Sequence, residues 1–235
     1  MKKILLPLLL LVALGAGYVY YTSLQKPTDV PVANLPVTGD VMTGDLQITS
    51  GSVSGDFETA SGSYIVWKAT KPTWYHTGKV FLTEGNVSIV SGVITSGSFN
   101  LDMTSITLDD IDNAKLLGEI KNAIFSVSTY PTSQFVITTV SMSATGYTVQ
   151  GNLTIAGQTH PIAFPATLTT RDDETRLQAA FAIDRLVRWL NAFQGVANDY
   201  IEYTVDLIFS PVVSLPTDVL TGTASTWSMS TGIAN

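Results

Sequence analysis

The sequence predicts an all-β protein whose antiparallel strands close into a barrel or pair as a sandwich. Apolar and polar residues alternate with a period of two along most of residues 63–211, the pattern of strands with one buried and one wet face. Turn-forming pairs such as Ser91-Gly92 and Ala156-Gly157 separate these runs. Only residues 109–123 interrupt the pattern with a clear helical spacing. About eight or nine strands fit in this length, and closure would remove their exposed edges.

Composition excludes several classes of function. Charged residues make up 13% of the chain, against about 25% in an average protein, and hydrophobic residues make up 45%, which is enough to fold a core. The net charge of −7 disfavours nucleic-acid binding, which needs a basic surface. The chain has no cysteine and only two histidines, His76 and His160, so disulfides and thiolate or His-rich metal sites are excluded.

Residues 1–21 are expected to lie outside the folded domain. Lys2 and Lys3 precede an uncharged apolar stretch over residues 4–21, which just reaches the ~17–25 residues that span a bilayer. The alternative is a cleaved secretory signal with small residues at 13–17. Either way, we expect the remaining chain outside the cytoplasm, anchored by an N-terminal helix or secreted after cleavage.

Two segments of simple composition flank the predicted domain. Residues 22–62 contain Pro27, Pro31 and Pro36, followed by many Gly, Ser, Thr and Asp residues, a composition typical of an extended or flexible linker. Residues 212–235 are rich in Ser and Thr and are expected to form a tail. The barrel domain is therefore expected over residues 63–211.

The period-two runs define an expected inward face for successive strands. This face carries Phe99, Leu101 and Met103, then Phe135 and Ile137, then Tyr147, Val149, Leu153 and Ile155, then Leu177, Phe181 and Ile183, and finally Ile201, Tyr203, Val205, Leu207 and Phe209. A slip of one residue in any strand would exchange this face with the surface.

The segment over residues 109–123 is expected to be a short helix. Leu116, Leu117 and Ile120 have helical spacing. The acidic residues Asp109, Asp110 and Asp112 precede them, and we expect these carboxylates to stabilise the start of the helix through its dipole. A second short helix or turn is expected at residues 185–193.

Six short pieces of sequence occur in order and together resemble one family. They are residues 63–67 (SYIVW), 76–78 (HTG), 97–106 (GSFNLDMTSI), 116–135 with Tyr130-Pro131, 151–161 (GNLTIAGQTHP) and 183–185 (IDR). No single piece is specific, but their order is. The domain resembles the YceI-like family, bacterial polyisoprenoid-binding proteins with a lipocalin-like barrel.

This resemblance implies an antiparallel barrel of about eight strands with one or two short helices. It also implies an apolar interior that holds an isoprenoid chain such as a quinone tail. Because the family is bacterial, the resemblance together with residues 1–21 implies a place in the periplasm or cell envelope, anchored in the inner membrane, or secretion after cleavage. The sequence departs from the family pattern at residues 119–122, around Phe125 and after Arg185. These positions fall on the helix and at the barrel mouth, so they leave the identity of the ligand open.

The expected inward residues can hold such a ligand by burial alone, at ~0.8 kcal/mol per CH₂ before association costs. His76 is expected either to donate to a ligand head group at the barrel mouth or to be an ordinary hydrogen-bonded strand histidine. We expect the ligand to contact Trp67, His76, Phe99, Leu101, Met103, Phe135, Ile137, Tyr147, Val149, Phe164, Phe181, Ile183, Tyr203, Val205 and Leu207. The alternative is that these side chains meet in a solid core, as most apolar stripes do.

The residues do not predict an enzyme. Asp109, Asp110 and Asp112 lack the pattern of a calcium loop, and no arrangement of nucleophile and base stands out. We therefore expect a binding protein without catalytic residues, metal or cofactor. Its expected partners are the lipid and, through the N-terminal helix, the membrane, with a homodimer as an open alternative. The competing function is an envelope interaction or scaffold module with a solid barrel, and a continuous cavity would discriminate between the two.

Overall fold

The computed structural model describes residues 27, 29–33, 54–71, 74–143, 146–171, 174–185 and 200–212. Within these ranges nine strands form one sheet, and all their pairings are antiparallel. The strands are β1 (Gly55–Thr59), β2 (Tyr64–Thr70), β3 (Tyr75–Val90), β4 (Val93–Asp102), β5 (Thr132–Ser143), β6 (Gly146–Ile155), β7 (Gln158–Arg171), β8 (Glu174–Asp184) and β9 (Tyr200–Pro211).

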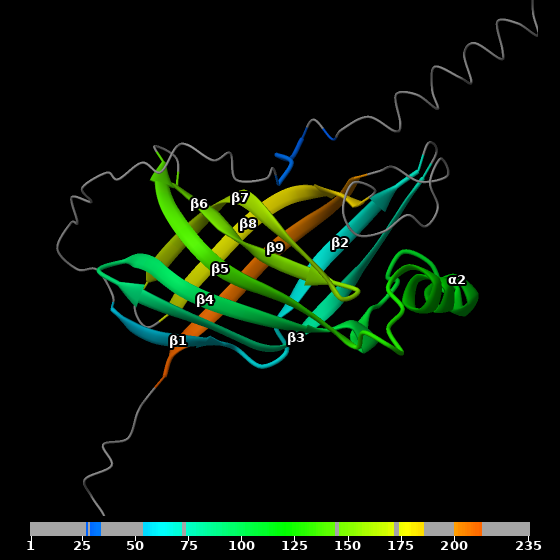
Figure 1. The fold of residues 1–235 in the computed structure, drawn as a ribbon, viewed down its shortest axis with the longest axis horizontal. Coiled ribbons are helices and arrows are strands. Elements are labelled where there is room, and N and C mark those ends of the chain that lie inside the picture. Colours follow the sequence, from blue (N-terminus) through cyan, green and yellow to red (C-terminus); the bar gives the residue numbers. More distant parts are fainter. Residues whose placement is uncertain are drawn as a thin grey trace, which may run out of the picture.

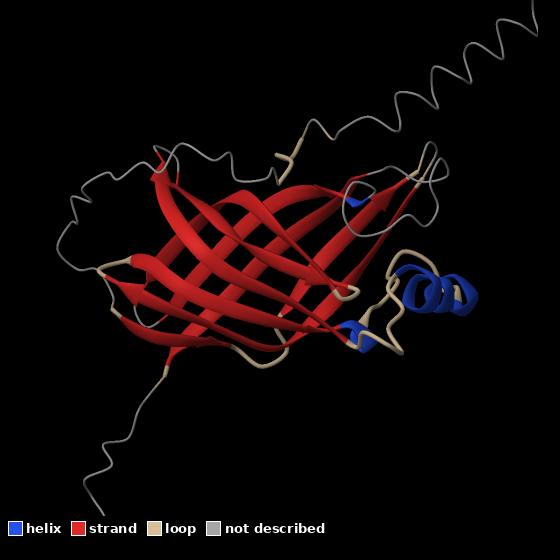
Figure 2. Cartoon of the chain, viewed as in Figure 1, coloured by secondary structure: helices blue, strands red, loops and turns tan. Residues whose placement is uncertain are grey.

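The sheet closes on itself as a barrel. From β2 to β9, each strand pairs with the next in sequence, and β9 pairs back with β2. β1 and β2 share one place in the ring, because each pairs with β3 on one side and with β9 on the other. The nine strands therefore form a closed barrel of eight positions (Figures 1 and 2).

The two ends of the barrel differ. At one end the paired ends of β2 and β3 and the helical segment between β4 and β5 extend beyond the neighbouring strands (Figure 1). We call this end the mouth. At the opposite end β3 and β4 are joined by a tight hairpin at Ser91-Gly92, where both residues have positive φ.

The antiparallel barrel and one short helix are confirmed, but the barrel begins earlier than predicted. Phe57 on β1 is 2% exposed and belongs to the core, so the predicted linker over residues 22–62 is too long. The expected N-terminal helix over residues 1–21, the tail from residue 213 onward and most of the expected second helix at 185–193 lie outside the described residues. In the described ranges, no helix has the length and apolar character needed to cross a bilayer.

The helical segment differs from the prediction in how it begins. A 3-10 turn over Met103–Ser105 precedes α2 (Ala114–Glu119), which continues as a π-helical turn over Ile120–Ile124. Asn113 caps α2, its side chain accepting from the Leu116 N–H at 3.0 Å, and the first turn holds no acidic residue. The prediction that Asp109, Asp110 and Asp112 stabilise the start of the helix is therefore wrong. These residues lie in the loop before it.

One seam of the barrel lacks a continuous backbone ladder. β7 pairs with β6 along residues 158–166, but with β8 only from residue 167 onward. Pro161 and Pro165 lie four residues apart on β7, so their nitrogens face the same edge of the strand. Proline has no N–H to donate. Both prolines lie in the stretch of β7 that does not pair with β8, so two of the donors that a ladder there would use are missing.

Residues 29–33, which we call the strap, cover the part of β8 that β7 leaves open. The Ala182 N–H donates to the Pro31 carbonyl at 2.9 Å, and the Ala33 N–H donates to the Ala182 carbonyl at 2.8 Å. Ala182 lies between the inward residues Phe181 and Ile183 and so faces outward, yet it is 0% exposed. The strap is what buries it.

Candidate ligand-binding cavity

The barrel encloses a cavity of about 320 Å³. Side chains from β2 to β9 line it, and residues of α2 and the following turn line its mouth end. Most of this lining is aliphatic or aromatic. The polar lining side chains are Lys71, His76, Glu119, Ser133, Arg185 and the hydroxyl of Tyr203. The cavity is therefore an apolar tube, with most of its charged groups near the mouth.

The end opposite the mouth is filled by side chains. Five apolar residues there are at most 2% exposed and do not line the cavity: Phe57, Val87, Ile89, Ile94 and Phe209. The barrel is thus solid at one end and hollow toward the other. A ligand in the cavity would have its far end against this plug and its near end at the mouth.

A chain of aromatic rings crosses the interior between these two regions. Successive ring centroids lie 6.4 Å apart for Phe99–Phe135, 5.5 Å for Phe135–Phe164, 4.2 Å for Phe164–Phe181 and 5.9 Å for Phe181–Tyr203. The Phe164–Phe181 pair is stacked and spans the seam between β7 and β8. Gly151 leaves room for the chain, because a Cβ there would lie 2.4 Å from Cζ of Phe135.

All but one of the residues expected to contact a ligand line this cavity. The lining includes Trp67, His76, Phe99, Leu101, Met103, Phe135, Ile137, Val149, Phe164, Phe181, Ile183, Tyr203, Val205 and Leu207. Tyr147 does not belong to it. Its ring lies toward the plugged end, where its hydroxyl donates to the Gly92 carbonyl at 3.2 Å, and it lines a separate groove on the barrel wall. The alternation along β6 predicts the buried residues Val149, Leu153 and Ile155, but Tyr147 lies closer to the plugged end than the cavity reaches.

His76 at the mouth is held by a carboxylate from the helical segment. Its Nδ1 lies 2.9 Å from Oδ2 of Asp110, and Oδ1 of Asp110 accepts from the Thr77 N–H at 2.9 Å. Because a carboxylate only accepts, Nδ1 carries the hydrogen, and in the neutral ring Nε2 is left as an acceptor. The sequence prediction paired Asp110 with the helix instead, since nothing in the sequence links residues 76 and 110.

The same contacts shift the titration of Asp110. Desolvation acts to raise the pKa of its carboxyl group, but the hydrogen bonds from the Thr77 N–H and the His76 ring, with the electrostatic attraction of that ring, outweigh it. The net result is a pKa below the ordinary value of an aspartate. Asp110 is therefore ionised at neutral pH and keeps the His76 ring oriented at the mouth.

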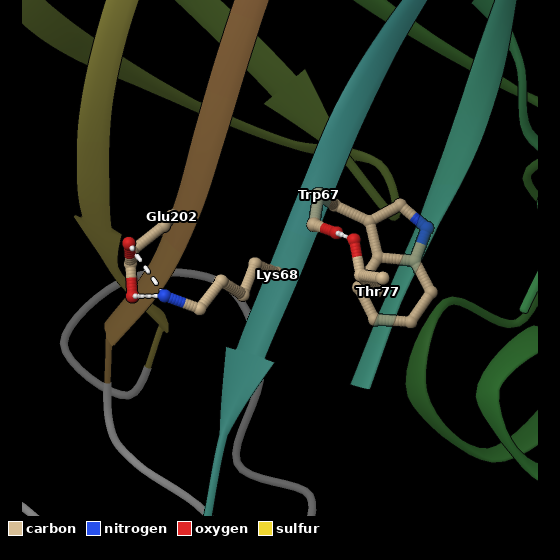
Figure 3. A network of polar contacts seen from close by, with 4 residues as sticks. All are labelled: Trp67, Lys68, Thr77 and Glu202. Carbon is tan, nitrogen blue, oxygen red and sulfur yellow. Dashed lines mark hydrogen bonds and ion pairs between the residues drawn. The ribbon is translucent and has the colours of Figure 1, made fainter. Parts of the chain in front are cut away.

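Trp67 and Gly78 explain two of the sequence pieces that carry the family resemblance. They are partners across β2 and β3, and a Cβ on Gly78 would lie 2.8 Å from the Trp67 ring and 2.0 Å from the Thr107 carbonyl oxygen. Only glycine allows both approaches. Figure 3 shows the Trp67 ring and the Lys68 side chain on opposite sides of β2, with Thr77 donating to the Trp67 carbonyl at 2.8 Å and Lys68 paired with Glu202 at 3.1 Å.

Two buried polar atoms in the cavity wall have no hydrogen-bond partner among the described residues. They are Nε1 of Trp67 and Oγ of Ser133, whose residues are 9% and 4% exposed. An unsatisfied buried donor costs roughly 1–3 kcal/mol. These atoms therefore mark places where a ligand atom or a bound water would be stabilised.

Tyr203 and Arg185 complete the polar lining. Burial raises the pKa of the Tyr203 phenol to about 12, so it remains a neutral hydrogen-bonding group at any physiological pH. Arg185 follows β8 directly and is 6% exposed. Sequence reasoning included Tyr203 but omitted Arg185 and Ser133. Each lies two residues from a predicted inward residue, Ser133 from Phe135 and Arg185 from Ile183, so the alternation indicated their direction, but a search for an apolar lining passed over polar side chains.

The described ranges contain no group of three or more His, Asp or Glu side chains arranged to hold a metal ion. What the barrel presents is an enclosed apolar space with polar groups at its entrance. A closed antiparallel barrel with such an interior belongs to the class of β-barrel proteins that can hold a small apolar ligand.

The comparison with protein families identifies the particular group. The YceI-like domain family matches residues 36–210, and the chain belongs to this family. The match begins upstream of β1 and ends one residue before the end of β9.

Solved structures show the same fold. A polyisoprenoid binding domain from Saccharophagus degradans, implicated in plant cell wall breakdown, is 14% identical, with a TM-score of 0.54 over 68% of this chain and 100% of that one. BcnA from Burkholderia cenocepacia is 20% identical, with a TM-score of 0.50 over 62% of this chain and 95% of that one. A comparison with curated proteins gave no match.

Proposed function

We propose that this protein binds, without catalysis, a long apolar ligand inside its barrel: an isoprenoid, a quinone tail or another lipid. The observation that carries the proposal is the cavity of about 320 Å³, which is enclosed by apolar side chains and falls within the ~300–1,000 Å³ of typical ligand pockets. Membership of the YceI-like family and the likeness to a polyisoprenoid binding domain support it.

Burial supplies a large part of the free energy of binding. At ~0.8 kcal/mol per CH₂, a chain of about twelve carbons gives roughly 10 kcal/mol against association costs of about 4–15 kcal/mol. The ligand is longer than this or uses polar contacts as well. The polar groups that line the cavity include Nε2 of His76, the Arg185 guanidinium and the Tyr203 hydroxyl. Two further groups, Trp67 Nε1 and Ser133 Oγ, have no hydrogen-bond partner among the described residues. We therefore expect a polar head group at the mouth and the tail toward the plug.

We further propose that the barrel works outside the cytoplasm, held at the inner membrane by residues 1–21. The two lysines and the apolar stretch that follows them support this location. An apolar ligand of this kind resides in membranes, so a tether would keep the barrel close to its source. The scaffold alternative explains the structure less well, because a solid core would leave no cavity.

Two substitutions on β9 test the proposal. Leu207 faces the cavity and is 2% exposed, whereas its neighbour Ile208 faces outward and is 37% exposed. Leu207→Trp fills part of the cavity and should abolish most uptake of a prenylated quinone, while Ile208→Trp should bind it as the wild type does. Uptake is measured by extraction of the purified full chain after incubation with the quinone. Equal uptake by both variants, with unfolding curves close to the wild type, would contradict the proposed site.

A further inference from the structure

The rim of the mouth carries Trp74, the most exposed large apolar side chain among the described residues, together with two other exposed apolar side chains. Trp74 is 62% exposed and Tyr75 is 48% exposed, and their rings stack with centroids 6.2 Å apart. Tyr75 is the first residue of β3 and Trp74 precedes it, so both lie at the end of β3 that borders the mouth (Figure 1). Ile111, in the loop before α2, is 45% exposed. We call Trp74, Tyr75 and Ile111 the rim patch.

Hydrogen bonds join the two backbone segments that carry the rim patch. The Asp109 N–H donates to the Thr77 carbonyl at 2.8 Å, and Asp110 binds both His76 and the Thr77 N–H. Ile111 and Tyr75 each lie one residue beyond these contacts. The rim patch therefore sits directly outside His76, the residue that lines the cavity entrance.

Cationic side chains gather at the same end of the molecule. The mouth end carries Lys68, Lys71, Lys79, Lys115, Lys121 and Arg185, whereas Arg176 lies on the outer wall near the plugged end. Acidic residues accompany the first group, so the mouth is close to neutral. In contrast, Asp56, Glu58, Glu84 and Glu174 give the plugged half an excess of negative charge. An anionic lipid surface would repel the plugged half and tolerate the mouth.

The kind of residue also indicates the kind of partner. Trp and Tyr have an apolar body and a polar tip, and they are enriched where membranes meet water. Lysine suits the same place, because its alkyl stem packs on apolar surface while its ammonium group stays in water. Lys68 lies 5.7 Å from the Tyr75 ring centroid, and Lys71 lies at the cavity mouth beside the stacked pair.

We propose that the rim patch docks the mouth of the barrel onto the surface of a phospholipid bilayer. Trp74, Tyr75 and Ile111 enter the interfacial layer, so the cavity entrance faces the membrane and an apolar chain passes between bilayer and barrel without crossing water. The transfer of an apolar chain in this inference rests on the proposed function. The contact itself depends only on the rim patch.

The absence of cysteine in the natural sequence allows a direct test. Single cysteines are introduced by Ile111→Cys at the rim and by Met142→Cys at the plugged end, where Met142 is 52% exposed. Each full-length variant is labelled with an environment-sensitive dye and reconstituted in vesicles of phosphatidylethanolamine and phosphatidylglycerol. Lys115→Cys on α2, whose side chain is 88% exposed, provides a second rim probe if labelling at residue 111 disturbs the loop.

We expect blue-shifted emission and quenching by brominated lipids for the rim probes and not for the Met142 probe. A tether at residues 1–21 would hold both ends near the bilayer, so the difference between the two ends reports orientation. Combined Trp74→Ala and Tyr75→Ala substitutions should remove most of the rim signal, whereas Val90→Ala, at a 55% exposed position of the plugged end, should not.

Equal signals from both ends, or a rim signal that survives loss of Trp74 and Tyr75, would overturn docking. Lipid extraction from the same samples separates this result from the proposed function. Bound lipid with a water-exposed rim refutes docking alone, and a membrane-embedded rim on a barrel that never holds lipid refutes the carrier function alone.

Discussion

Asp110 connects two parts of the chain that are distant in sequence, and it does so at the entrance to the cavity. Its two oxygens bind the His76 ring and the Thr77 backbone. One carboxylate thus anchors the loop before α2 and sets which nitrogen of His76 faces the cavity. The sequence shows an acidic cluster at residues 109–112 and a histidine at 76, but only the fold brings them together.

The lowered pKa of Asp110 predicts how this contact depends on pH. Because its folded pKa lies below the unfolded value of about 3.9, the stabilisation is fully present above that pH and is lost as pH falls through the folded pKa. Asp110→Asn should therefore lower the free energy of unfolding at pH 7 by about 1–3 kcal/mol, and by less at pH 3. Urea unfolding at the two pH values measures this, with the exposed Asp112→Asn as control. An equal loss at both would contradict it.

Gly78 predicts a second effect at single-residue scale. A methyl group there would meet the Thr107 carbonyl oxygen at 2.0 Å, and this backbone cannot move without breaking its bonds to Lys79. Gly78→Ala should destabilise the protein by about 1–3 kcal/mol. Gly118 in α2 has open space around its Cβ position, so Gly118→Ala should stabilise it by roughly 0.5–1 kcal/mol. Thermal unfolding compares the two, and similar effects would refute the close-approach argument.

At the scale of elements, the alternating pattern predicted the inward faces of the long strands, because period two is a local property of a strand with one buried side. It could not predict β1, whose Gly/Ser/Thr-rich surroundings resemble a linker and whose place in the ring depends on distant strands β3 and β9. The strap could not be predicted for the same reason. Residues 31–33 pair with Ala182, about 150 positions later in the sequence, and only the folded barrel brings the two together.

The seam between β7 and β8 is a weak line of the barrel wall, because side chains and the strap hold it where the backbone ladder is missing. Ala33→Pro removes the N–H that donates to Ala182. We expect the Ala182 amide then to exchange its hydrogen several-fold faster, and the paired residues 174–178 to stay unchanged. Pro31→Ala keeps the carbonyl acceptor and is the control. Hydrogen-exchange mass spectrometry resolves these peptides, and unchanged exchange at Ala182 would show that the strap does not hold the seam.

At the scale of the whole molecule, the barrel combines a packed half and a hollow half. Phe57, Ile89 and Phe209 fill one end, and the same alternating pattern lines a cavity toward the other. The sequence alone could not separate these halves. The alternating pattern shows that a side chain points inward, but not whether another side chain contacts it across the barrel. Tyr147 shows this directly, as an inward position that falls in the filled half.

The central claim is that the hollow half holds a long apolar ligand. The most direct measurement is a native mass spectrum of the full chain purified from a bacterial host, followed by solvent extraction and analysis of the extract. We predict one extra mass per chain that extracts as a prenyl or other long-chain lipid. A chain that is empty after purification, and that stays empty when offered a prenylated quinone, would contradict the account.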